Sequence, residues 1–203
     1  MHGAGAHRGI SAIAKRFCRD RRGVAAIEFA FIVPVLLIMY FITMEASQAI
    51  ETSKKVSRIG SMVADLVTQQ TSVKKADLDA IMKIGTSTLQ PYNRSTPTII
   101  ITGIQITDEA SPKVKVAWSR KLVGATYSAD AAKDSITTIP ATLNIRNTFL
   151  VRVESDLGYK PIITWSADGS KTLGLTSAFN NISMGETYYL RPRRGPSVPC
   201  SDC

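Results

Sequence analysis

The chain has 203 residues and a formal net charge of +9, with 25 Lys and Arg against 16 Asp and Glu. That length accommodates one ordinary domain and a membrane segment. Six of the basic residues lie within residues 1–23 beside a single acid, Asp20, so this segment alone carries +5. Because the remaining +4 (9 minus 5) is spread over the rest of the chain, the basicity belongs to the N-terminal segment, and no nucleic-acid partner is expected.

Both histidines, His2 and His7, lie in this basic segment. The rest of the chain therefore has no imidazole for a Ser-His-Asp triad, a Cys-His pair or a histidine-based metal site. No P-loop or dinucleotide fingerprint is present. The carboxylates are scattered without a supporting motif, which favours solvated surface charge over a glycosidase-type pair. We expect no enzymatic activity, no cofactor, no metal and no small-molecule substrate.

Residues 24–44, VAAIEFAFIVPVLLIMYFITM, contain one charge, Glu28. At about 1.5 Å per residue, a helix of this length spans roughly the 30 Å of a bilayer's hydrocarbon core. The basic residues ahead of it predict a cytoplasmic N-terminus and a periplasmic C-terminal part. A secretory signal peptide cut after Ser47-Gln48-Ala49 is the alternative. A charge such as Glu28 deep in a bilayer costs about 2.5–3.5 kcal/mol, and a simple signal peptide has no reason to carry it.

Residues 21–29 read RRGVAAIEF: basic residues, Gly23, and then an apolar helix with Glu28 at its fifth position. This segment resembles the prepilin peptidase motif. The longer run RRGVAAIEFAFIVPVLL is similar to the opening of TadE-like proteins, components of tight-adherence (Flp-type) pilus systems. Residues 188–193, YYLRPR, resemble the close of many such chains. The resemblance implies cleavage between Gly23 and Val24, and it implies membrane lipid, a prepilin peptidase and other pilus-assembly proteins or pilins as partners.

Glu28 and Phe29 are the residues for which we expect a role in assembly. Cleavage after Gly23 would leave a new ammonium group at Val24. In a filament or membrane assembly, the Glu28 carboxylate of one subunit could neutralise the terminus of a neighbour and offset the burial of both charges. The alternative is a solvated Glu28 at the membrane boundary. The glycine before the helix and the alanine-rich flanks favour the assembly role.

Apolar residues continue beyond the membrane segment in steps of three and four as far as Val67. This spacing predicts an amphipathic helix that continues the first one to about Gln69, or else a separate helix after a bend. Ser72 is a candidate N-cap for a second helix, which Pro91 ends.

Short runs of alternating or β-branched residues predict an antiparallel sheet in the second half of the chain. The expected strands are 98–107, 113–121, 149–154, 159–165 and 185–190. Val114, Val116 and Trp118 are expected on one face. Pro161 indicates an edge strand, and Gly124–Pro140 is typical of a surface loop. The sum is an α+β fold: a long N-terminal helix, transmembrane and then amphipathic, packed on a small antiparallel sheet.

The tail from Arg191 holds three prolines and is expected to be loosely ordered. It contains Cys200 and Cys203, which we expect either to form a disulfide in an oxidising periplasm or to have no role. A disulfide to a partner is a further alternative. A redox role is not expected, because a redox C-x-x-C normally opens a helix in a βαβ setting. Zinc would need more ligands than this pair provides.

The chain is therefore divided into a basic cytoplasmic leader (1–23), a transmembrane helix (24–44), a periplasmic helical region (45–92), a periplasmic antiparallel sheet region (93–190) and a Pro/Arg-rich tail (191–203). The expected function is that of a non-enzymatic inner-membrane component, a minor pseudopilin, of a Tad/Flp-type pilus assembly or secretion apparatus. Two alternatives stay open: an uncleaved membrane-anchored binding module of the envelope, and a secreted hydrolase behind a signal peptide.

Overall fold

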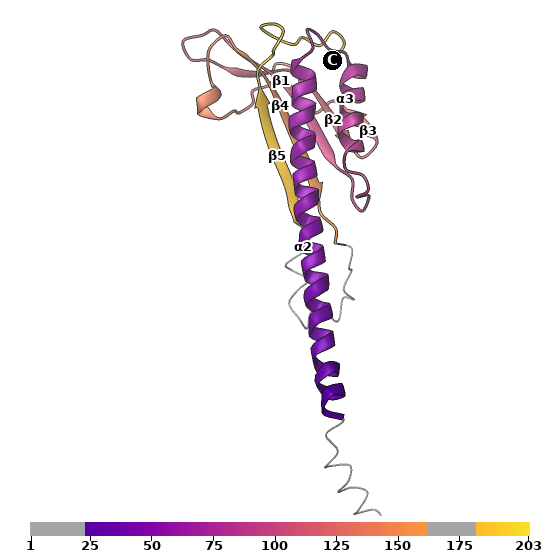
Figure 1. The fold of residues 1–203 in the computed structure, drawn as a ribbon. Helices are drawn as coiled ribbons and strands as arrows, with labels where there is room; N and C mark the ends of the chain where they lie inside the picture. The colour runs from indigo at the N-terminus through magenta and orange to yellow at the C-terminus, as the bar shows by residue number, and fades with distance from the viewer. Residues whose placement is uncertain (1–22, 162–181) are drawn as a thin grey trace, which may run out of the picture. The chain divides into compact units, whose positions relative to one another are not determined.

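The computed structural model describes residues 23–161 and 182–203, and it divides into two units, Met1–Ala46 and Ser47–Cys203. Figure 1 labels its elements: α2 (Val24–Thr68), α3 (Lys75–Ser87), β1 (Thr98–Ile106), β2 (Val114–Val123), β3 (Thr126–Ser128), a short 3-10 helix η2 (Ala141–Leu143), β4 (Phe149–Gly158) and β5 (Ser183–Leu190). The long N-terminal helix and the antiparallel sheet confirm the predicted α+β fold.

The five strands form one antiparallel sheet in the order β3-β2-β1-β4-β5. β1 lies at the centre, where Ile101 is paired with Arg120 of β2 and with Val153 of β4. β1 is rich in isoleucine and threonine, whose branched side chains suit a pleated surface that is covered on both sides.

One face of the sheet is covered by α3 and by the part of α2 that follows Ser47 (Figure 1), and the two helices share a core with β1, β2 and β4. Fully buried members of this core include Ile59, Val63, Leu78, Met82, Ile99, Ile101, Leu122, Val151 and Leu157. On the helices these residues recur at steps of three and four, which places them on one side of each helix. Gly85 lets α3 approach α2 closely, because a Cβ at this position would lie 2.9 Å from Val63 Cγ2.

A smaller core occupies the opposite face of the sheet. Ile104, Ile106, Val114 and Leu150 are buried there, beneath Ile139 and Leu143 of the connection between β3 and β4. The Arg152 side chain donates a hydrogen bond from Nη1 to Thr137 Oγ1 at 3.1 Å and ties this connection to β4. The segment predicted as a surface loop therefore covers the second core.

β2 contains a bulge at Ala117. Gly103 pairs with Trp118, but the next residue of β1 pairs with Val116, so Ala117 has no partner of its own in the ladder. An extra residue in one strand reverses the alternation of its side chains. Val114 consequently packs in the smaller core and Trp118 in the core under the helices. The prediction that Val114, Val116 and Trp118 share one face is therefore wrong.

The start of the second helix differs from the prediction, and the structure contains one strand that was not predicted. Ser72 does not cap the second helix, because the chain stays extended through the buried Val73, which forms a bridge with Cys200, and α3 begins only at Lys75. β3 was not predicted. It follows a two-residue turn in which Gly124 has φ +62, a conformation that glycine adopts readily.

Two further predictions concern the segments after β4 and β5. Residues 159–161 form no strand, and residues 162–165 of that expected strand lie outside the described residues. Tyr159 is instead buried and stacks on Tyr92, with ring centroids 5.8 Å apart. The expected loosely ordered tail is wrong, because Val198 is fully buried in the main core.

Candidate functional site

The first part of α2 presents a continuous apolar surface. Its exposed large side chains are Val24, Ile27, Phe29, Phe31, Ile32, Val35, Leu36, Leu37, Ile38, Met39, Tyr40 and Phe41. Among the described residues, α2 is the one helix long and apolar enough to cross a membrane, and none of its most apolar stretch is buried. An apolar surface of this extent is normally covered by lipid or by other proteins. This surface is the first part of the candidate site.

The residues expected at the processing and assembly motif lie at the start of this surface. Helix α2 begins at Val24, immediately after Gly23, and Glu28 lies one turn further on with an exposed side chain beside the exposed Phe29. A Cβ added to Gly23 would meet no atom within 4 Å, and Gly23 does not have a positive φ. The described fold therefore gives no reason for glycine at this position.

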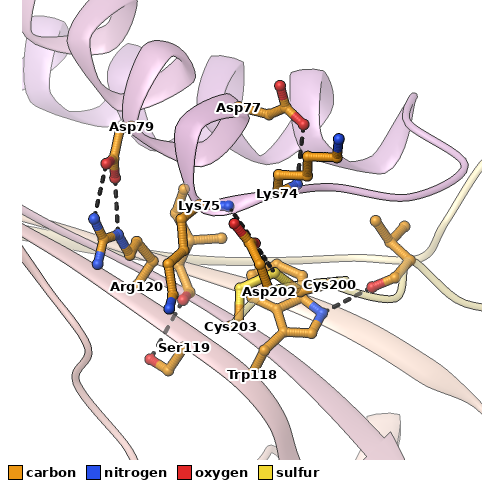
Figure 2. Close-up of a disulfide and its surroundings, with 12 residues drawn as sticks. Lys74, Lys75, Asp77, Asp79, Trp118, Ser119, Arg120, Cys200, Asp202 and Cys203 are labelled. Atoms are coloured by element: carbon orange, nitrogen blue, oxygen red, sulfur yellow. Dashed lines mark hydrogen bonds and ion pairs between the residues drawn. A yellow bond between two sulfur atoms is a disulfide. The ribbon is translucent and has the colours of Figure 1, made fainter.

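The second part of the candidate site is the C-terminal segment. The structure joins Cys200 Sγ and Cys203 Sγ in a disulfide (Figure 2). Val73 donates its N–H to Pro199 O at 2.9 Å and accepts the N–H of Ser201 at 3.1 Å. These residues belong to the second unit, whereas Gly23, Val24, Glu28 and Phe29 belong to the first. The expected site residues thus form two separate groups.

The tail is also tied to the sheet and to α2. Trp118 donates its Nε1–H to Val198 O at 2.8 Å, and Arg193 donates its N–H to Thr68 O at 2.9 Å, at the end of α2. The Arg193 guanidinium also forms an ion pair with Asp65. Proline content alone suggested a loose tail, and the signal that would have argued otherwise is Val198, an apolar residue among prolines and serines.

An ion pair joins α3 to β2 next to this segment (Figure 2). Arg120 donates from Nε to Asp79 Oδ1 and from Nη2 to Asp79 Oδ2, both at 2.8 Å. This paired hydrogen bond, strengthened by the charge of Asp79, outweighs partial burial and raises the pKa of Arg120 above its ordinary value. Sequence reasoning missed the pair, because the two residues are 41 positions apart.

A groove lies beside the connection between α3 and β1, and it too was missed from sequence. Gln48, Glu51, Thr52 and Lys55 of α2 line it, together with residues 91–94. Arg94 lies over the Tyr92 ring, 4.7 Å from its centroid, and Tyr92 in turn stacks on Tyr159. A guanidinium over an aromatic face is an attractive contact. Arg94, Tyr92 and Tyr159 therefore hold the connection between α3 and β1 against the core of the second unit.

The described residues contain no histidine, since His2 and His7 lie outside them. One group within the described part of the chain, Cys200, Asp202 and Cys203, has the donor atoms of a metal site. Its two sulfurs are bonded to each other and so are not available as thiolates, the form that binds metal. The arrangement is therefore that of a structural link.

One exposed apolar helix followed by an α+β unit is the architecture of a single-pass, membrane-anchored protein. In the comparison with known families, the model described as TadE-like protein matches residues 23–58. The chain thus carries a TadE-like domain, consistent with a TadE-like protein of Tad pilus systems, a family of pilus-assembly components. This match confirms the predicted resemblance. No curated protein and no solved structure matches the chain.

Proposed function

We propose that this chain is a minor pseudopilin, a non-enzymatic component of a Tad/Flp-type pilus assembly or secretion apparatus. Residues 24–44 span the inner membrane, with the N-terminus in the cytoplasm and the α+β unit in the periplasm. The observation that carries the proposal is the exposed apolar surface of α2, which starts directly after Gly23 and lies within the segment that matches the TadE-like model.

The exposed side chains of residues 24–44 support insertion into lipid. Each Å² of apolar surface removed from water contributes about 25 cal/mol, and this surface includes four large aromatic rings, Phe29, Phe31, Tyr40 and Phe41. Pro34 leaves one carbonyl of the preceding turn without its helical partner, which membrane helices tolerate. The six basic residues before Gly23 support the proposed orientation.

Cleavage by a prepilin peptidase accounts for the glycine at position 23. Neither contacts nor backbone conformation require glycine there, because an added Cβ meets no neighbour within 4 Å. A peptidase that selects glycine before the cleaved bond would impose such a requirement. Cleavage between Gly23 and Val24 then leaves an ammonium group at the first residue of α2.

Glu28 is the residue that would pair with this ammonium group in an assembly. It lies four residues beyond Val24, about 6 Å along the helix axis at 1.5 Å per residue, and its side chain is exposed. In a lipid environment an ion pair between the Glu28 of one subunit and the Val24 terminus of the next offsets the cost of burying either charge alone. The partners are thus other pilus-assembly proteins or pilins that present such a terminus.

The experiment is a comparison of Glu28→Gln with Glu51→Gln, an exposed acid on the same helix but outside the membrane segment. Each full-length variant replaces the natural protein in cells that hold a complete Tad system. We expect both variants to be cut and inserted into the membrane. Glu28→Gln should lose co-purification with the other Tad components at least about tenfold, the loss expected for an unpaired charge in a dry interface. Equal co-purification of the two variants would contradict the proposal.

A further inference from the structure

The N-cap residue of α3 makes no side-chain cap hydrogen bond. The N-cap position is Lys74, whose ammonium group offers donors only. The first N–H groups of a helix have no partners within it and require acceptors from elsewhere. Asp77 accepts the Lys74 N–H at 2.9 Å, but the N–H groups of Lys75, Ala76 and Asp77 have no carbonyl partner within the helix.

The acceptor for the Lys75 N–H comes from the far end of the chain. Asp202 accepts the Lys75 N–H through Oδ1 at 2.8 Å, and Figure 2 shows its carboxylate directly beside the start of α3. A negative charge at a helix N-terminus also interacts favourably with the helix dipole. Asp202 therefore does for α3 what an N-cap residue does, although 127 positions separate it from Lys75.

Two features hold Asp202 in this place. Upstream, the strand-like pairing of Val73 with Cys200 and the hydrogen bond from Trp118 Nε1 to Val198 O fix the chain as far as Cys200. Beyond Cys200 the side chains of the segment are exposed, and the disulfide to Cys203 closes a small ring that contains Asp202. Closing so short a ring restricts the chain only locally, so its effect falls on the residues inside it.

We propose that Cys200 and Cys203 are an oxidative modification site, and that their disulfide is the latch that holds Asp202 as the cap of α3. This inference goes beyond the proposed function in assembly. Formation of the bond removes one proton from each thiol and two electrons from the pair. The disulfide of a thiol-oxidising protein of the cell envelope accepts these electrons and protons and becomes a dithiol. Cys203 is exposed and Cys200 half-buried, so the pair is open to such a partner.

Amide hydrogen exchange of the full chain in detergent micelles tests the latch. Cys18→Ser serves as the background, so that the only thiols are those of the C-terminal pair. The oxidised protein is compared with the same protein after reduction. Both forms are also prepared with Asp202→Ala, which removes the acceptor, and with the control Ser201→Ala, which makes the same change at the other residue of the ring. Exchange at Lys75 reports the cap, and exchange at Ile101 in β1 reports the fold as a whole.

Reduction should speed exchange at Lys75 about fivefold, the population change that corresponds to loss of one N-cap, and leave Ile101 unchanged. Asp202→Ala should reproduce this change in the oxidised protein and add nothing in the reduced protein, whereas Ser201→Ala should have no effect in either. An equal effect of Asp202→Ala in both forms, or unchanged exchange on reduction, would overturn the latch. If reduction speeds exchange at Ile101 by the same factor as at Lys75, the disulfide stabilises the fold as a whole, and the latch as a local device is overturned.

The modification itself is tested in cells, and this part rests on the proposed export of the α+β unit. Maleimide labelling of the Cys18→Ser protein without reductant should find no free thiol, and labelling after reduction should find two. Free thiols in untreated cells would overturn the oxidation step. The exchange experiment uses purified protein, so its result stands or fails independently of export and of any role in pilus assembly.

Discussion

Gly103 lies opposite Trp118 in the β1–β2 ladder, and a Cβ on Gly103 would lie 2.5 Å from Cε2 of the Trp118 ring. The absence of a side chain at Gly103 is what lets the indole approach β1 closely in the core under the helices. The same ring donates its Nε1–H to Val198 O, so the position of the indole determines where the C-terminal segment is attached.

Gly103→Ala should therefore destabilise the α+β unit. The added methyl group would displace the indole or the Phe149 ring, and overpacking of this kind costs about 1–3 kcal/mol. Urea or thermal unfolding measures the loss. Gly158→Ala is the matched control, because an added Cβ there meets nothing within 4 Å, and its change should stay within about 0.5 kcal/mol. Equal stability of the two variants would mean that Gly103 does not shape the packing of Trp118.

A hydroxyl pair joins α2 to the edge strand β5. Ser57 Oγ and Tyr188 OH are hydrogen-bonded, and the Tyr188 ring lies against Gly60 of α2. Tyr188→Phe keeps the ring and removes the hydrogen bond, so we expect a loss of about 1 kcal/mol in the free energy of unfolding. Tyr189→Phe, the same change at the next position, should have little effect. A loss that is equal at both positions would assign the effect to strand β5 in general.

The Arg120–Asp79 pair should make a measurable contribution because both side chains are partly buried and the pairing is bidentate. We expect Arg120→Met to lower the free energy of unfolding by about 1–2 kcal/mol. Lys113→Met removes an exposed pair with Glu109 and should cost less than about 0.5 kcal/mol.

The pH dependence of the same variant follows from the raised pKa of Arg120. A group whose pKa is raised by folding contributes its stability fully below the pKa of the unfolded chain, and that contribution is lost only as the pH rises through the folded pKa. For an arginine both values lie far above neutrality. The deficit of Arg120→Met should therefore be the same at about pH 6 and about pH 9, and a deficit that shrinks toward about pH 9 would contradict charged pairing.

Much of the fold could be predicted because it depends on local pattern. The spacing of apolar residues at three and four positions predicted that the long helix ends at about Gln69, one residue from its observed end at Thr68. Alternation found β4, and runs of β-branched residues found β1. These patterns involve only residues that are close together in the sequence. The elements can therefore be predicted without knowledge of the tertiary structure.

The rest depends on contacts between distant residues. The bulge at Ala117 and the burial of Val198 follow from packing in the folded sheet. The spacing of apolar residues in the sequence predicts neither of them. The cap of α3 illustrates the same limit, because Ser72 is a good N-cap by type, yet the carboxylate at the helix start comes from Asp202. Of the candidate site, the membrane segment was readable from sequence and the C-terminal attachment was not.

Gly23→Asp should block conversion of the protein to a shorter form without changing its fold. The structure has open space around this position, so the substitution does not disturb packing, whereas a peptidase that selects glycine would reject it. Gly9→Asp, at another glycine of the basic segment, should leave processing intact. Mobility on denaturing gels, in cells with an active prepilin peptidase, distinguishes the two forms. Normal conversion of Gly23→Asp would contradict processing at this bond.

The mature N-terminus of the natural protein is the most direct measurement. The protein is extracted from membranes of cells with an active Tad system, and its first residues are determined by mass spectrometry or chemical sequencing. We predict a membrane-bound species that begins at Val24 and retains the apolar helix. A free species that begins near Ile50 and lacks that helix would contradict the assignment as a pseudopilin, and a membrane-bound species that still begins at Met1 would contradict processing.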